Sequence, residues 1–205
     1  MTASGTIMQV SEKFHACRVL VHDDAFEAQI TLHMVLPLLK NVVRELKRDY
    51  LYKSGVFLRR SLTRYLVLAL FRLIDKPNES GATGVTASIS SLLEMAKAEK
   101  VLTDDQIRQF TDDFNEIKSE GAQGEYDLVQ AIRNLRTIQV AHSLIPKLDP
   151  TDQVWAHDLA DFAEAIFNFV VDLEAALEKA TGITLTDLRE NADAGQFWRA
   201  LTSMK

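Results

Sequence analysis

The stretch that decides the fold is residues 56–74, which read VFLRRSLTRYLVLALFRLI. Its apolar residues recur three and four positions apart, as they do on a helix that buries one face. That apolar stripe consists of Leu58, Leu62, Tyr65, Leu66, Ala69, Leu70 and Leu73. Val67, Leu68 and Phe71 widen it almost all the way round, so we expect this helix to lie centrally or also to cover a partner subunit.

The chain as a whole is poor in residues that break helices. It has 8 Gly and 4 Pro among 205 residues, whereas a β-sandwich or β-barrel needs turn residues every ~8–12 positions. This composition predicts an all-α, up-and-down bundle of about five to seven helices. We expect one domain over residues 1–205, with its core at about 10–180 and a tail helix within 183–205. The single cysteine, Cys17, excludes a disulfide framework and a multi-cysteine metal site.

Capping residues and helix breakers predict where the other helices begin and end. Ser11 should cap a long helical pattern over residues 11–53, with a kink or boundary near Leu36 because Pro37 follows. The helix of residues 56–74 should stop before Pro77. A further helix is expected in SISSLLEMAKAEK (residues 88–100), capped by Thr86 or Ser88, and another from Thr103 to the residue before Gly121. The last three helices are expected over 126–144, over 155–180 with Gly182 as the stop, and over 193–203.

Motifs for several other functions are missing from the sequence. The longest strongly apolar run, Tyr65–Phe71, is far shorter than the ~20 residues that cross a bilayer, and the N-terminus lacks the pattern of a signal peptide. We therefore expect a cytoplasmic protein without membrane contact. Glu12 and His15 form one Glu-x-x-His motif, but a di-iron bundle needs two, and no glycine-rich loop could hold a phosphate group. Neither a metal nor another cofactor is expected.

The charge of the chain is distributed unevenly. The net charge is −6, which argues against general nucleic-acid binding, yet residues 41–76 carry nine basic side chains against three acidic ones. Such a segment is either a solvated helix face or a local positive field for a polyanion. Under the second interpretation, Arg59, Arg60 and Arg64 are the candidate RNA-binding residues. Residues 151–178 have seven acids and no Lys or Arg, which predicts an acidic outer helix face.

A chemical motif lies in the helix expected over residues 126–144. Residues 132–143 read IRNLRTIQVAHS, in which Arg136 and His142 are separated by five residues near a helix end. Upstream, the chain has FLRRSL at 57–62, then an apolar helix that closes on RLID at 72–75, a polar loop and a Leu-rich helix. This order, together with the Arg-x5-His spacing, resembles the abortive-infection (AbiU2-like) branch of the HEPN superfamily. The resemblance covers roughly residues 10–180.

The resemblance implies a helical bundle that dimerises and brings the Arg and His of both subunits to one cleft. Active members are metal-independent endoribonucleases, often toxins or phage-defence effectors, in which the 2′-hydroxyl of RNA attacks the adjacent phosphate. Carried onto this chain, His142 would be the general acid or base and Arg136 would hold the phosphate. The supporting residues would be Arg133, Asn134, Thr137 and Ser143. Such effectors also have an antitoxin or regulatory protein as a partner.

The residue types fit this chemistry independently of the resemblance. Imidazole titrates near neutral pH and can exchange protons with a hydroxyl, and guanidinium binds phosphate through a charged fork. On one helix, Arg136 and His142 would lie about 120° and ~9 Å apart, a spread that favours a dimer in which two helices complete the site.

Thr137 opens an alternative, because active members commonly have Asn, Asp or His directly after the motif Arg. A catalytically inactive HEPN-like bundle that binds RNA, a nucleotide or a protein partner is the second hypothesis. A structural interaction module without a nucleic-acid role is the third. In both, Arg136 and His142 would simply be part of a polar helix end.

Overall fold

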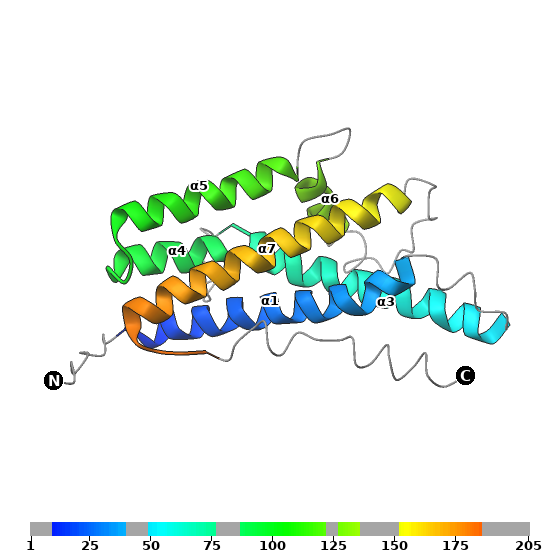
Figure 1. Cartoon of the computed structure of the whole chain (residues 1–205), viewed down its shortest axis with the longest axis horizontal. Coiled ribbons are helices and arrows are strands. Elements are labelled where there is room, and N and C mark those ends of the chain that lie inside the picture. The colour runs from blue at the N-terminus through cyan, green and yellow to red at the C-terminus, as the bar shows by residue number, and fades with distance from the viewer. Residues whose placement is uncertain (1–9, 40–48, 77–86, 122–126, 136–151, 186–205) are drawn as a thin grey trace.

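The structure is a computed structural model that describes residues 10–39, 49–76, 87–121, 127–135 and 152–185. Within these residues it contains six α-helices and no β-strand (Figure 1). The helices are α1 (Glu12–Leu39), α3 (Asp49–Ile74), α4 (Ile89–Ala98), α5 (Asp104–Glu120), α6 (Leu128–Leu135) and α7 (Asp152–Thr181). The all-α bundle that the composition predicts is therefore confirmed. The tail helix predicted over 193–203 lies outside the described residues.

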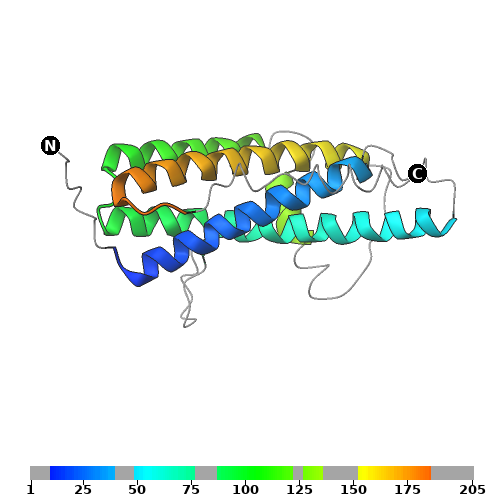
Figure 2. The ribbon, with the colours of Figure 1, turned by 60° about the horizontal axis from the view of Figure 1, so that its bottom comes forward.

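The helices form an elongated bundle around one continuous apolar core. α1 packs along both α3 and α7, α4 pairs with α5, and the short α6 packs on α3. In both orientations the N-terminal end of α3 extends beyond the ends of α1 and α7 (Figures 1 and 2). The core draws on all six helices, including Leu32 of α1, Leu70 of α3 and Ile132 of α6. None of the described helices is both long and apolar enough to cross a membrane.

The predicted caps account for three of the six observed helix starts. The Ser11 hydroxyl accepts a hydrogen bond from the Phe14 N–H at 3.1 Å, and Ser88, not Thr86, caps α4 through the Ser91 N–H. Thr103 begins α5 with a reciprocal capping box, in which its side chain accepts from the Gln106 N–H and the Gln106 side chain accepts from the Thr103 N–H. Gly182 follows α7 with φ +71°, a left-handed conformation that favours glycine at a helix end.

No helix boundary lies at Leu36, and the second helix begins earlier than the sequence pattern places it. α1 continues through Pro37 to Leu39, the last described residue before 49. α3 already begins by Asp49 and includes Ser54 and Gly55, the pair that the pattern places between the two helices. A glycine costs a helix only about 1 kcal/mol, and Gly55 is buried, so packing outweighs this penalty.

A buried ion pair joins α1 to α7. Arg18 is only 1% exposed, and its Nε donates to Glu174 Oε2 at 2.9 Å while its Nη2 lies 2.8 Å from the same oxygen. The Arg18 Nη1 also donates to the Thr181 hydroxyl at 3.3 Å. Burial raises the pKa of Glu174 even though Arg18 acts in the opposite direction, so desolvation of this carboxylate outweighs its attraction to the guanidinium.

This ion pair corrects the prediction that all seven acids of residues 151–178 belong to one outer face. Glu174 points into the bundle, whereas Asp158, Asp161 and Asp172 are exposed. The apolar face predicted for the same helix is confirmed. Its members are all buried, and they are Leu159, Phe162, Ala163, Ile166, Phe169, Val170, Leu173 and Leu177.

Candidate nucleic-acid interface

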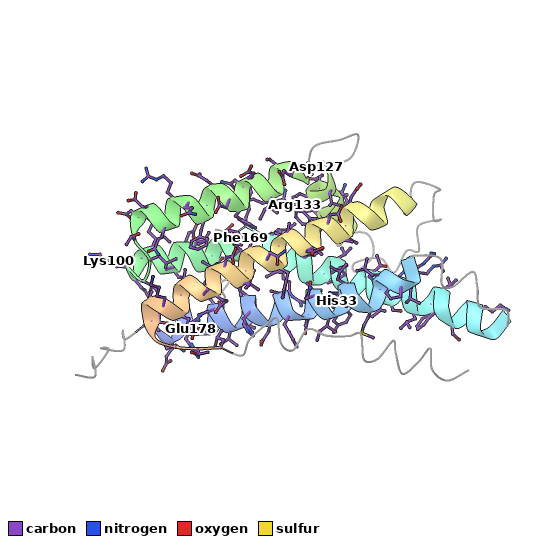
Figure 3. All side chains as sticks on the ribbon, viewed as in Figure 1. His33, Lys100, Asp127, Arg133, Phe169 and Glu178 are labelled. Atoms are coloured by element: carbon purple, nitrogen blue, oxygen red, sulfur yellow. The ribbon has the colours of Figure 1, made fainter. Side chains whose placement is uncertain are left out.

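α6 carries the first part of the predicted motif helix. Asp127 caps it, because its Oδ1 accepts a hydrogen bond from the Gln130 N–H at 2.8 Å. The buried side chains of Leu128, Val129 and Ile132 anchor α6 in the core. This anchoring leaves Arg133 half-buried at the edge of the core (Figure 3).

Two of the predicted site residues can be placed on this helix, and four cannot. Arg133 and Asn134 lie in the last turn of α6, about 100° apart around its axis. Asn134 is exposed, and its Oδ1 accepts a hydrogen bond from the Gln130 Nε2 at 3.0 Å. The remaining motif residues lie outside the described part of the chain, and they are Arg136, Thr137, His142 and Ser143. Their proposed roles stay predictions.

Two lysines that the motif does not include lie near Arg133. Lys118 belongs to the last turn of α5, and Lys76 follows the end of α3. Burial is the largest cause that lowers the pKa of Lys118, and the positive charges of Arg133 and Lys76 lower it further. No local motif signals this arrangement, since the three residues are separated by 42 and 15 positions in the sequence.

The three predicted RNA-binding arginines of α3 do not share one face. Arg60 and Arg64 are four positions apart, so they lie within about 40° of each other around the helix axis. Arg59 is about 140° away from Arg64, on the side where Leu66 and Leu70 enter the core. Arg60 and Arg64 therefore lie on one face of α3, and Arg59 lies on a different face.

Two aromatic side chains of α3 are exposed, and Phe57 lies on the same side of the helix as Arg60 and Arg64. Phe57 is 73% exposed and Tyr65 is 57% exposed, and both fall on the half of α3 that points away from the core. The placement of Tyr65 in the buried stripe is therefore wrong. We call the surface formed by Phe57, Arg60 and Arg64 the α3 outer face, since these three positions lie within about 60° of one another around the helix axis. Exposed aromatics among arginines can stack on nucleic-acid bases while the cations contact the backbone.

Not every cation of the basic segment is available to a polyanion. The Arg72 Nε donates to Asp24 Oδ1 at 2.8 Å, and its Nη2 donates to Glu27 Oε2 at 2.9 Å. The hydrogen bond to Asp24 is the largest cause that raises the pKa of Arg72. Arg72 therefore joins α3 to α1, and its charge is compensated by two carboxylates.

The described residues offer no group of three His, Cys, Asp or Glu side chains that could hold a metal ion. On α1, His15 is exposed and His22 is buried, and the His22 Nδ1 lies 3.4 Å from Asp23 Oδ1. Cys17 is buried, and burial raises the pKa of its thiol, so this cysteine is held in the unreactive thiol form.

Comparison with known proteins supports the resemblance seen in the motif. The family model HEPN_AbiU2, described as AbiU2, matches residues 52–197. The match extends from α3 through α7 and leaves α1 outside. Neither a curated protein nor a solved structure matches the chain. Because the family model spans well over half of the sequence, the chain belongs to the HEPN AbiU2 family.

Proposed function

We propose that this protein is a metal-independent endoribonuclease of the toxin or phage-defence type that acts as a homodimer. The observation that carries the proposal is the family match over residues 52–197, within which the sequence contains the Arg136-x5-His142 motif. An antitoxin or another regulatory protein would be the partner that restrains it.

The residues of the motif have separate roles in this mechanism. His142 would take the proton of a ribose 2′-hydroxyl, or would give a proton to the departing 5′-oxygen, as a general base or acid. Arg136 would hold the phosphate through its guanidinium fork as negative charge develops on the phosphate oxygens. The attack of the 2′-oxygen on phosphorus breaks the bond to the 5′-oxygen and leaves a 2′,3′-cyclic phosphate.

The α3 outer face supports RNA as the substrate. Arg60 and Arg64 supply positive charge beside Phe57, a large side chain that is mostly exposed. Stacking on such rings tolerates any base, while phosphate contacts to arginine are independent of sequence. The protein can therefore hold single-stranded RNA near the bundle even though its net charge is −6.

Incubation of the purified protein with end-labelled single-stranded RNA and a chelator tests the proposal. We expect shortened fragments that end in a 2′,3′-cyclic phosphate, and no cleavage of DNA of the same sequence because it lacks the 2′-hydroxyl. The cleaving fraction should have twice the 23.1 kDa mass of the chain in light scattering at micromolar concentration. Loss of cleavage in the chelator would contradict the metal-independent mechanism, and an active monomer would contradict the dimer.

A second candidate function is a catalytically inactive HEPN bundle that binds RNA, a nucleotide or a protein partner. Thr137 favours it, because a threonine hydroxyl can donate a hydrogen bond but is not a strong base. In this case RNA should bind and remain intact.

The arginines of the α3 outer face separate RNA binding from a purely structural role. Replacing both Arg60 and Arg64 by alanine should weaken RNA binding and reduce the slope of log affinity against log salt by about 0.7 for each phosphate that the variant no longer neutralises. Arg59→Ala is the matched control, since this residue lies off that face, and it should have a smaller effect. Fluorescence anisotropy of labelled RNA at several salt concentrations measures both quantities. An unchanged slope in the double variant would remove the α3 outer face from the interface.

A further inference from the structure

α1 carries apolar side chains on two opposite sides. On one side Val21, Ala25 and Leu32 enter the core. Four more apolar side chains lie within about 100° of one another on the opposite side of the helix axis. They are Val19, Leu20, Ile30 and Met34, and we call them the α1 outer face. A helix that is apolar all round is normally covered on every side, so we expect a cover on this face as well.

The described helices leave the α1 outer face at least partly uncovered. Leu20 is 52% exposed. Val19, Ile30 and Met34 are half-buried, but among the described residues none of them belongs to the partly buried apolar side chains that pack against the core. Asp23 lies between them, and its side chain is 63% exposed. The face is therefore an apolar stripe with an exposed carboxylate.

The chain leaves α7 beside the first turns of α1. The Thr181 hydroxyl at the end of α7 accepts a hydrogen bond from the Arg18 Nη1 at 3.3 Å, and Arg18 directly precedes Val19. Gly182, with φ +71°, then reverses the backbone, and the Ile183 N–H donates back to the Thr181 hydroxyl at 3.2 Å. Figures 1 and 2 show the chain after α7 turning back toward the middle of the bundle. The residues that follow 185 therefore start within reach of the α1 outer face.

The sequence of residues 196–205, which lie outside the described part of the chain, complements this face. Its large aliphatic and phenylalanine side chains recur four and three positions apart, the spacing of an apolar stripe on a helix. They are Phe197, Leu201 and Met204. The segment also contains Arg199 and Lys205 and no acidic residue. Its charge is therefore opposite to that of the exposed carboxylate on the α1 outer face.

The intervening chain is long enough to bring this segment onto α1. Residues 185 and 197 are twelve positions apart, so the chain between them can span ~40 Å. The α1 outer face is only ~22 Å long from Val19 to Met34. A segment tethered this closely has an effective concentration in the millimolar range, which favours it over a second copy of the chain that binds from solution.

We propose that residues 196–205 bind along the α1 outer face of the same chain as an amphipathic helix. Phe197, Leu201 and Met204 supply the apolar contacts, in the manner of a helix that lays one face on an apolar surface. The basic side chains of the segment lie near Asp23. In this arrangement the segment is an intramolecular cover that keeps other proteins away from α1.

The fluorescence of Trp198 tests this proposal in the full chain. The sequence has two tryptophans, so Trp155→Phe gives a parent protein in which all tryptophan emission comes from Trp198. Its emission maximum in buffer should lie at a shorter wavelength than in urea, because binding to α1 removes the indole from water. Adding Leu20→Asp/Ile30→Asp should move the maximum to its value in urea, since two carboxylates replace apolar contacts. Circular dichroism checks that the bundle stays folded.

The matched control places the same two charges elsewhere. Asn168→Asp/Ala175→Asp changes two exposed positions of α7 and should leave the emission maximum of the parent unchanged. Equal shifts in the two variants would overturn the proposal, and so would a parent whose emission maximum in buffer already equals its value in urea.

Disulfide formation gives a second measurement that adds no charge to α1. Leu20→Cys/Leu201→Cys should form a bond within one chain when the dilute protein is oxidised in air, whereas Ala175→Cys/Leu201→Cys should stay reduced. The native Cys17 is buried and should not compete. Mass spectrometry of a non-reduced digest identifies the linked peptides. Equal linking of both pairs would contradict the proposal, and a bond between two chains would assign the α1 outer face to a second copy instead.

Discussion

Replacing His142 by alanine is expected to lower the rate of RNA cleavage by about 10²–10⁴-fold, the usual contribution of a positioned general acid or base. Alanine has no group that can accept the proton of the 2′-hydroxyl or protonate the 5′-oxygen. The affinity for RNA should change little, because phosphate binding is assigned to arginines and not to His142. Single-turnover cleavage of end-labelled RNA, together with anisotropy for binding, separates the two quantities.

His15→Ala is the matched control for this experiment. His15 is an exposed imidazole on α1, and its removal should leave the rate of cleavage unchanged. Cleavage that persists at the full rate in the His142→Ala protein would show that the nuclease belongs to a contaminant or to another site. Loss of cleavage in both variants would instead point to a general defect in folding.

Replacing Glu174 by leucine is expected to lower the free energy of unfolding by about 3–5 kcal/mol, because it leaves the buried Arg18 cation without its counterion. Arg18 is the largest fully buried side chain of the described residues, so its charge has no route to water. The midpoint of urea denaturation, with an unchanged m-value, measures this loss. Protein concentration must be held constant, since association also affects the midpoint.

Two further variants test the reason for this effect. Asp172→Leu removes an exposed acid two positions earlier on α7 and should change the stability by no more than about 0.5 kcal/mol. The double variant Arg18→Met/Glu174→Leu should return close to the wild-type stability, because burial already outweighs the ion pair at Glu174 and a well-packed apolar pair avoids that desolvation. A double variant as unstable as the single one would mean that cavity or packing effects dominate.

Local sequence signals are sufficient to predict much of the fold. The starts of α4 and α5 follow from Ser88 and Thr103, whose side chains satisfy N–H groups of the first turn, and the end of α7 follows from Gly182. These interactions join residues only a few positions apart, so the sequence reveals them directly. The resemblance to the HEPN family likewise depends on short motifs in fixed order.

Interactions between distant segments are the ones that the sequence does not reveal. Tyr65 has the spacing of a buried residue, but its exposure depends on which side of α3 the other helices occupy. Nothing in the local sequence distinguishes Glu174 from the other acids of α7. Its side chain is buried where it pairs with Arg18, which lies 156 residues earlier.

The packing of α1 against α7 also has a consequence for the order of folding. Arg18 and Glu174 are separated by 156 residues, and interactions of such long separation form late because a large loop must first be closed. During synthesis, the apolar side chains that α1 buries against α7 cannot reach their final partners until α7 has left the ribosome. A truncated product that ends before α7 would therefore expose part of the core and aggregate.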